Sequence, residues 1–350
     1  MVCNMKNNNR VLAMATIGLF LILGLSEQCY GALQPGYYNQ KCFITTTTGA
    51  WPLTKSQTTE VNVEATVKAA MKLAFTNDST IAAALLRMQF HDCFVKGCDA
   101  SILLDGKQSE KTATPNLSVR GYEVIDSIKK TLEKSCRQVV SCADIIVMAT
   151  RDAVSLASGG KVNYGVETGR LDGKVSNASN VNLPGPTISV SDSIKAFQQK
   201  GLGVNDMVYL LGGHTVGVAH CFLFQDRLYN FNGTNKPDPT MDPMLVKELK
   251  PKCPQKLNIA NTVFLDQTPS SSMVVDKAYF NQLVRKRGIL KIDQDLAIAR
   301  QTKDVVSQLA GGKDYEFAQK FGQAMVKLGR VEVITDTRKG EIRRSCNLKN

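Results

Sequence analysis

Histidine, tryptophan and long apolar runs are scarce in this chain of 350 residues. There are three histidines and one tryptophan, so any imidazole chemistry must use His91, His214 or His220. No serine stands in the GxSxG pattern of a nucleophile elbow, which argues against a serine hydrolase. No two cysteines have the CxxC spacing of a structural zinc site. After residue 25, no apolar run approaches the roughly 20 residues that a membrane-spanning helix needs.

Residues 1–31 have the layout of a secretory signal peptide. Lys6 and Arg10 precede an apolar run over 11–25, and polar and then small residues follow the run. Because the run is too short for a membrane anchor of roughly 20 residues, we favour a cleaved leader. The sequence therefore predicts a secreted, extracellular protein that is not held in a membrane.

Cysteine is more plentiful than histidine, and its number carries a structural prediction. Of the 10 cysteines, Cys3 and Cys29 fall within the predicted leader. The remaining even set, in an oxidising compartment, predicts four disulfides, although spacing alone allows 105 pairings.

The chain is also basic. Its net charge of +12 falls to +11 when the leader takes away Lys6, Arg10 and Glu27. A basic secreted protein can bind acidic wall polysaccharide. The basic residues are scattered and not interleaved with aromatic residues, so we expect no nucleic-acid partner.

The mature chain is predicted to be mainly α-helical, because apolar residues recur at helical spacing between turn-rich joints. Short strands are expected at 188–190 and 331–334. The threonine-rich segment 43–59 is interpreted as a surface loop or extension. A joint rich in asparagine, proline and glycine at 180–186 suggests a boundary between two lobes. The expected helices lie around 81–91, 121–136, 142–157, 190–200, 206–211 and 315–328.

Arg87 and His91 are four residues apart on a predicted helix, so both side chains project from one face. An imidazole can take up a proton and return it, and a fixed guanidinium can stabilise negative charge on an oxygen. On spacing alone, an ordinary pair on a helix surface is the simpler interpretation.

The residues after His91 could bind calcium. Asp92, Asp99 and Ser101 supply oxygen ligands at short spacing, and the backbone carbonyls of Val95 and Gly97 could complete the shell. The alternative is a solvated acidic turn, because the EF-hand pattern is absent.

Three motifs together resemble one family. The runs Arg87–Ser101, Ser141–Ile145 and Gly212–Cys221 are similar to the secretory plant peroxidases, the class III haem peroxidases, and the resemblance extends over about 33–347. It implies a mainly α fold with one haem b between a distal lobe (32–186) and a proximal lobe (187–350). It also implies two Ca²⁺ ions, a monomer, and a location in the cell wall or apoplast.

The resemblance implies a role for each matching site residue. His91 would be the distal acid and base, Arg87 its partner, and Phe90 a wall of the haem site. Asn116 would hydrogen-bond His91 and keep its reactive nitrogen unprotonated. On the proximal side, His214 would ligate the iron, Asp293 would accept the other ring proton of that histidine, and Pro184 would contact aromatic donors. His220 has no implied role.

The resemblance also implies calcium ligands and cysteine pairs. Ser270 or Ser271 could replace Thr268, because the spacing between Asp266 and Asp276 is unusual. The distal ligands would be Asp92, Val95, Gly97, Asp99, Ser101 and, through water, Glu110; the proximal ligands would be Thr215, Asp266, Thr268 and Asp276. The implied pairs are Cys42–Cys136, Cys93–Cys98, Cys142–Cys346 and Cys221–Cys253.

The function implied is that of a secreted haem peroxidase, which reduces hydrogen peroxide and oxidises small phenolic donors one electron at a time. The competing hypothesis is a catalytically silent, basic wall-binding protein on the same fold. Glycosylation sequons occur at Asn77, Asn116, Asn177 and Asn232. Because Asn116 is assigned to the haem pocket, a glycan there would contradict this interpretation.

Overall fold

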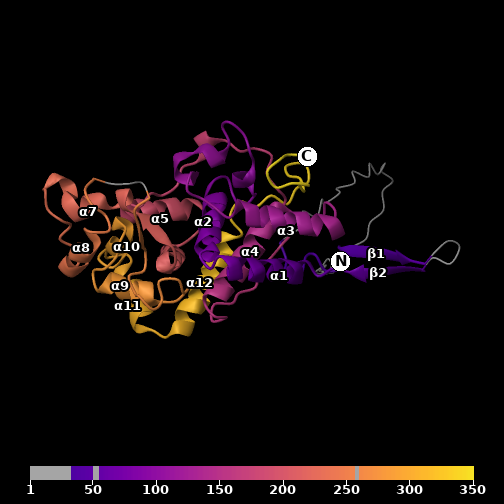
Figure 1. Ribbon diagram of the computed structural model, residues 1–350. Coiled ribbons are helices and arrows are strands. Elements are labelled where there is room, and N and C mark those ends of the chain that lie inside the picture. Colours follow the sequence, from indigo (N-terminus) through magenta and orange to yellow (C-terminus); the bar gives the residue numbers. More distant parts are fainter. Residues whose placement is uncertain (1–32, 50–54, 257–259) are drawn as a thin grey trace, which may run out of the picture. The chain divides into compact units, whose positions relative to one another are not determined.

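A computed structural model describes residues 33–49, 55–256 and 260–350. Residues Gly31–Asn350 form one compact unit, and the predicted leader lies outside the described residues. The unit is mainly helical, as predicted (Figure 1). Its helices are α1 (Val63–Asn77), α2 (Ile81–Phe94), α3 (Tyr122–Ser135), α4 (Cys142–Ala157), α5 (Val190–Gln199), α6 (Val204–Leu211), α7 (Gln225–Tyr229), α8 (Pro243–Leu249), α9 (Ala278–Val284), α10 (Lys291–Leu296), α11 (Lys303–Gly311) and α12 (Asp314–Leu328).

Local sequence explains where several of these helices begin. The side chain of Asn62 accepts a hydrogen bond from Ala65 N at the start of α1, and Ser141 and Ser189 cap α4 and α5 in the same way. Each cap satisfies a backbone N–H that has no partner within its helix. The caps therefore fix the first turn of α1, α4 and α5.

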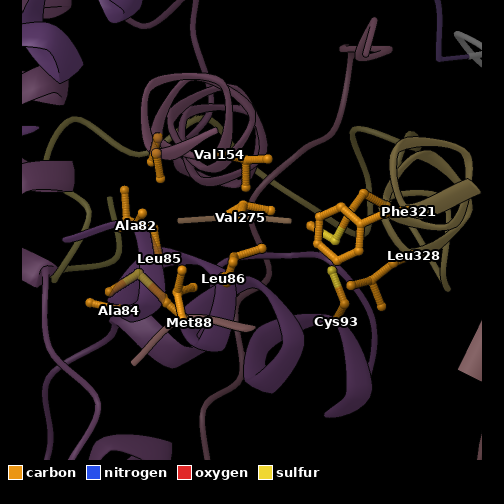
Figure 2. Close-up of a cluster of buried hydrophobic side chains, with 14 of the residues drawn as sticks. Ala82, Ala84, Leu85, Leu86, Met88, Cys93, Val154, Val275, Phe321 and Leu328 are labelled. Atoms are coloured by element: carbon orange, nitrogen blue, oxygen red, sulfur yellow. The ribbon is translucent and has the colours of Figure 1, made fainter. Parts of the chain in front are cut away.

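The core is built around α2 and α4. These two helices pack against each other, α1 and α3 also contact α4, and α12 packs on α6. Almost every residue of α4 is buried, because other elements surround this helix. Figure 2 shows part of the resulting apolar cluster, with Leu85 and Met88 of α2, Val154 of α4, and Phe321 and Leu328 of α12.

A second group of contacts lies in the carboxyl-terminal half. There α9 contacts α10 and α11, α10 contacts α5, and α6 contacts α5, α11 and α12. The element η5 (Gly212–Thr215) continues directly from α6. The lobe boundary at 186 stays a prediction, because residues 31–350 form a single unit.

Four disulfides cross-link the described unit, as predicted. They join residues between 5 and 204 positions apart in the chain. A disulfide of this kind typically stabilises a protein by about 2 to 4 kcal/mol. The pairs are those that the resemblance implied: Cys42–Cys136, Cys93–Cys98, Cys142–Cys346 and Cys221–Cys253.

The threonine-rich segment is a β-hairpin rather than an irregular loop. Strands β1 (Phe43–Thr48) and β2 (Lys55–Glu60) pair antiparallel, every residue in both is exposed, and they extend away from α1 and α3 (Figure 1). Threonine favours strands because its branched side chain fits the pleated surface. The prediction of a surface extension is confirmed, and the prediction of a loop was wrong.

Strand predictions elsewhere were also wrong. Residues 188–189 are irregular, Val190 begins α5, and 331–334 form a turn and irregular chain. The other strands in the described part are β3 (Val218–His220) and β4 (Thr262–Phe264), which pair antiparallel. Short apolar runs do not distinguish strands from buried turns.

Candidate functional site

The helix α2 presents one accessible face in an otherwise buried element. Arg87 is exposed, and Ala83 and Phe90 are partly exposed, while most other residues of α2 are buried. These three positions lie at i, i+4 and i+7, which is one side of a helix. The accessible side of this core helix therefore carries an arginine and an aromatic ring.

Hydrogen bonds fix the protonation of His91. The Nδ2 group of Asn116 donates to the carbonyl oxygen of Glu110 at 2.8 Å, so the other amide atom, Oδ1, faces His91. The His91 Nδ1 to Asn116 Oδ1 distance is 2.6 Å. Because Oδ1 can only accept, Nδ1 must carry the proton. In the neutral imidazole, Nε2 is then unprotonated.

Burial and the positive charge of Arg87 together lower the pKa of His91 to about 4. The hydrogen bond with Asn116 opposes this shift without cancelling it. The imidazole is therefore neutral near pH 7, and its Nε2 atom can accept a proton.

Arg87 is held next to that bare nitrogen. Its Nε donates to His91 Nε2 at 3.3 Å, while its terminal nitrogens donate to Ser118 Oγ at 3.0 Å and to the carbonyl oxygen of Pro115 at 2.8 Å. The guanidinium has no carboxylate partner in the described part of the chain. Its positive charge is therefore available to an anionic oxygen beside His91.

Aromatic packing holds Phe90 in place. Its ring centroid lies 4.3 Å from that of Phe94 and 6.0 Å from that of Phe197 on α5. Phe94 and Phe197 are both buried. Packing therefore fixes the Phe90 ring next to His91, and its role as a wall of the haem site stays a prediction.

The second histidine of the site, His214, lies in η5. Its Nδ1 is 2.8 Å from Asp293 Oδ1, and Asp293 is completely buried on α10. Burial alone would lower the pKa of His214, but the charge of Asp293 and the hydrogen bond to it raise the pKa above its ordinary value. With Nδ1 bound to the carboxylate, the lone pair of Nε2 is available to a metal.

The segments that carry the two histidines adjoin each other. Helix α2 contacts η5, and a β-carbon at Gly217 would come within 2.9 Å of the side chain of Ala83. Moreover, the positive charge of Arg87 lowers the pKa of His214. The structure therefore brings Arg87, His91 and His214 into one region, although 123 positions separate the two histidines in the chain.

These residues fit a haem. About 32% of the His214 side chain is exposed, and the accessible side of α2 carries Arg87 and Phe90. A histidine whose ring nitrogen can bind iron, and an apolar ring beside an accessible face, suit the binding of an iron porphyrin.

The predicted distal calcium ligands form a buried, oxygen-rich loop. Asp92, Asp99, Ser101 and Glu110 are buried, and the Ser101 Oγ and both Glu110 carboxylate oxygens have no hydrogen-bond partner in the described part of the chain. Burial and the charge of Asp99 raise the pKa values of Asp92 and Glu110, the latter to about 8. A cation would relieve this crowding of buried oxygens.

The backbone of this loop makes a tight turn that requires glycine. Gly97 has a φ of +103°, and a β-carbon there would lie 2.3 Å from the carbonyl oxygen of Glu332. The Cys93–Cys98 disulfide closes the same loop. Val95 and Gly97 are buried as well, so all the predicted distal ligands lie together in the interior.

The predicted proximal calcium ligands also adjoin one another. Thr215 Oγ1 donates to Asp276 Oδ1 at 3.4 Å, and burial raises the pKa of Asp266 to about 6. The Thr268 hydroxyl accepts a hydrogen bond from Gln282 Nε2 at 2.8 Å. By contrast, Ser271 Oγ and Asp266 Oδ2 are buried without a partner in the described part. A hydroxyl that accepts one hydrogen bond keeps a second lone pair, so Thr268 and Ser271 both remain candidates for the hydroxyl ligand.

No three histidine, cysteine or acidic side chains converge as a ready metal site within the described ranges. This finding does not conflict with the predicted calcium shells. Each shell combines two directly bound carboxylates with hydroxyl or carbonyl oxygens, which are common calcium ligands.

Two further predicted positions are clear in the structure. Pro184 is partly exposed, two residues before Pro186, whose carbonyl oxygen accepts from Ile292 N beside Asp293. This contact ties the predicted donor-binding segment to α10. His220, by contrast, lies on β3 with its ring stacked 5.5 Å from that of Phe222.

Sequence reasoning missed two residues that hold the site together. Ser118 fixes Arg87 from 31 positions away, and the Tyr279 hydroxyl donates to Asp293 Oδ1 at 2.8 Å. Neither residue has a local pattern that marks it, because both act through contacts between distant segments. Only the folded arrangement reveals them.

Comparison with known proteins gives the family. A sequence model of the family described as Peroxidase matches residues 63–312. The chain is 51% identical to Peroxidase 60 of Arabidopsis thaliana over 93% of this chain and 92% of that protein. It is 45% identical to Peroxidase 57 of the same plant over 95% and 96%, and 39% identical to Peroxidase 5 of Vitis vinifera over 98% and 99%.

The chain therefore belongs to the peroxidase family, and the resemblance to the class III haem peroxidases is confirmed. It is an oxidoreductase with a haem peroxidase function. The family implies haem and calcium as cofactors, and hydrogen peroxide and phenolic donors as substrates. Among the described residues, no helix could cross a membrane.

Proposed function

We propose that this protein is a secreted peroxidase in which His91 is the acid and base, Arg87 the charge-stabilising partner, and His214 the iron ligand. The observation that carries the proposal is the hydrogen-bond chain from Glu110 through Asn116 to His91. This chain leaves His91 Nε2 unprotonated. A base in this state, beside a guanidinium that has no carboxylate partner in the described part of the chain, is suited to hydrogen peroxide.

The proton moves through one atom of the protein. His91 Nε2 takes a proton from the near oxygen of hydrogen peroxide and returns it to the far oxygen, which leaves as water. Arg87 stabilises the negative charge on the departing oxygen while the bond breaks. When bound, haem would supply the two electrons that this cleavage needs and would recover them singly from donors; with two further protons the near oxygen then leaves as a second water.

Asp293 prepares the opposite side for the cofactor. Its carboxylate accepts the Nδ1 proton of His214, which orients the ring and increases the electron density on Nε2. An electron-rich ligand stabilises oxidised iron. Phe90 would cover the distal face, and we propose Pro184 as a contact for phenolic donors at the haem edge.

Two calcium ions would complete the protein. The distal ion would use Asp92, Asp99, Ser101 and the carbonyls of Val95 and Gly97, with Glu110 joined through water. For the proximal ion we propose Thr215, Asp266, Asp276 and the hydroxyl of Thr268 or of Ser271; the Ser271 Oγ atom is buried without another partner in the described part of the chain. Each ion would tie a histidine-bearing segment to the surrounding core.

The extracellular assignment agrees with the surface of the unit. Four disulfides suit an oxidising compartment. Asn77 and Asn232 are exposed and Asn177 is partly exposed, so all three sequons can carry a glycan, whereas Asn116 is 2% exposed. The basic monomer would reside in the cell wall, where acidic polysaccharide is a possible partner.

An absorption spectrum tests the proposal. The purified protein should show a Soret band, and one equivalent of hydrogen peroxide should change it rapidly; a phenolic donor should then restore the original spectrum. A folded protein without a Soret band, after haem and calcium are supplied, would contradict the proposal. That result would favour the catalytically silent wall-binding protein.

A further inference from the structure

The carboxylate that serves His214 has a second donor on the same oxygen. His214 Nδ1 and the Tyr279 hydroxyl each lie 2.8 Å from Asp293 Oδ1. The other oxygen, Oδ2, is buried and has no hydrogen-bond partner among the described residues. The two donors therefore share one acceptor atom although the carboxylate offers a second.

The surroundings hold this arrangement in place. Tyr279 is 1% exposed and Asp293 is fully buried, so bulk water does not reach the shared oxygen. The Tyr279 ring packs edge-on against His214 at 6.3 Å and against Phe280 at 5.0 Å. Ring packing therefore holds the aromatic part of Tyr279, and the hydrogen bond to Asp293 holds its hydroxyl.

The direction of the second hydrogen bond is settled by chemistry. An ionised carboxylate can only accept, so the phenol must donate. Burial and the neighbouring Asp293 raise the pKa of Tyr279 well above its ordinary value. The phenol therefore keeps its proton at any physiological pH.

We propose that Tyr279 is a positioning residue of the proximal site, which takes part of the acceptor strength of Asp293 and so limits the negative charge passed to His214. The inference rests on the proposed iron ligation by His214. A carboxylate oxygen that already accepts a strong hydrogen bond attracts a second donor less, and the effect is larger in a buried site of low dielectric. Tyr279 thus sets how strongly the ligand stabilises oxidised iron.

The experiment removes one hydroxyl from the haem-loaded enzyme. In Tyr279→Phe, Asp293 should accept more strongly from His214, so the Fe(III)/Fe(II) midpoint potential should fall and the iron–histidine stretching frequency of the ferrous form should rise. The expected change in the reduction equilibrium is up to about tenfold, which corresponds to about 59 mV for one electron. Both readouts report on the ligand itself, so loss of packing alone would not shift them together in this sense.

The matched control is Tyr38→Phe. The Tyr38 hydroxyl also donates to a buried carboxylate, Asp144 Oδ2, at 2.6 Å, but Asp144 contacts Arg170 and not a histidine. This variant loses the same kind of hydrogen bond elsewhere in the fold. Its potential and stretching frequency should equal those of the wild type.

A second variant keeps the test decisive if Tyr279→Phe does not fold. Placing 3,5-difluorotyrosine at position 279 retains the ring and makes the hydroxyl a stronger donor, so the potential should rise and the stretching frequency fall. Unchanged values in the variants that fold, or shifts opposite to those expected, would overturn the inference while leaving the peroxidase function intact. A wild-type protein without a Soret band would overturn both.

Discussion

The two histidines of the site differ in the group that holds their Nδ1 atom. His91 faces the neutral amide of Asn116, whereas His214 faces the carboxylate of Asp293. Burial and Arg87 lower the pKa of His91 to about 4, while Asp293 raises the pKa of His214 despite burial. In the proposed function, one ring would therefore be a neutral base that can take up a proton, and the other would be an electron-rich ligand of the iron. The two histidines differ in their proposed roles because the groups that hydrogen-bond their Nδ1 atoms differ in charge.

Removing the base should break the distal half of this comparison most severely. In His91→Ala, the spectral change after mixing haem-loaded protein with hydrogen peroxide should slow by about 10²- to 10⁴-fold, because proton transfer loses its acceptor. Stopped-flow absorbance at the Soret band measures the rate. The control is His220→Ala, which changes a histidine outside the site. A His91→Ala rate close to wild type would refute the assignment.

Making the proximal acceptor resemble the distal one sharpens the comparison. In Asp293→Asn, a neutral amide replaces the carboxylate, so oxidised iron should be less stable and the midpoint potential should rise. Hydrogen bonds to charged groups exceed neutral ones by about 1 to 2 kcal/mol, so the reduction equilibrium should shift by roughly 5- to 30-fold. Spectroelectrochemical titration gives the value, and a lower potential would contradict the proposed role of Asp293.

Removing the distal acceptor should have a smaller effect than removing the base. In Asn116→Ala, His91 remains but its Nδ1 proton is no longer fixed, so part of the population carries the proton on Nε2. The reaction with peroxide should slow by about tenfold, the equivalent of one hydrogen bond of about 1.4 kcal/mol. A loss as large as that of His91→Ala would show that Asn116 does more than orient the ring.

The calcium sites offer the mildest test of the two sides. The proposed distal site adds Glu110, joined through water, to Asp92 and Asp99, whereas the proximal set has only Asp266 and Asp276. Because affinity rises with ligand charge, a chelator should remove the proximal ion first, at a concentration about tenfold lower. Calcium content by atomic emission follows the loss. In Asp266→Asn, only the first calcium ion should be lost at a lower chelator concentration, and in Asp99→Asn only the second. If Asp99→Asn changed the first loss instead, the proposed order would be wrong.

Periodicity alone predicted much of the helical framework. The expected helices at 142–157 and 190–200 match α4 and α5 within one residue, because both have clear apolar spacing and a serine at their start. Helix α1 was not predicted. The β-hairpin was missed because its strands bury no face, so no alternation of apolar residues marks them.

The site was less accessible to direct sequence reasoning. Arg87 and His91 lie four residues apart on one helix, and Arg87 Nε is 3.3 Å from His91 Nε2. Asp293, however, lies 79 positions beyond its partner His214, and only the family resemblance connected them. Tyr279 was invisible because its role depends on an oxygen that another helix supplies. Long-range hydrogen bonds are properties of the packed chain.

The β-hairpin has a practical consequence. Val61 N donates to the carbonyl oxygen of Cys42 at 2.9 Å, so the two ends of the hairpin lie next to each other. The Cys42–Cys136 disulfide links this point to the rest of the protein. Lengthening a flexible segment whose ends already meet adds little entropy cost. We therefore expect that this hairpin can be trimmed, extended or replaced, for example by a tether to a solid support, with little effect on the rest of the fold.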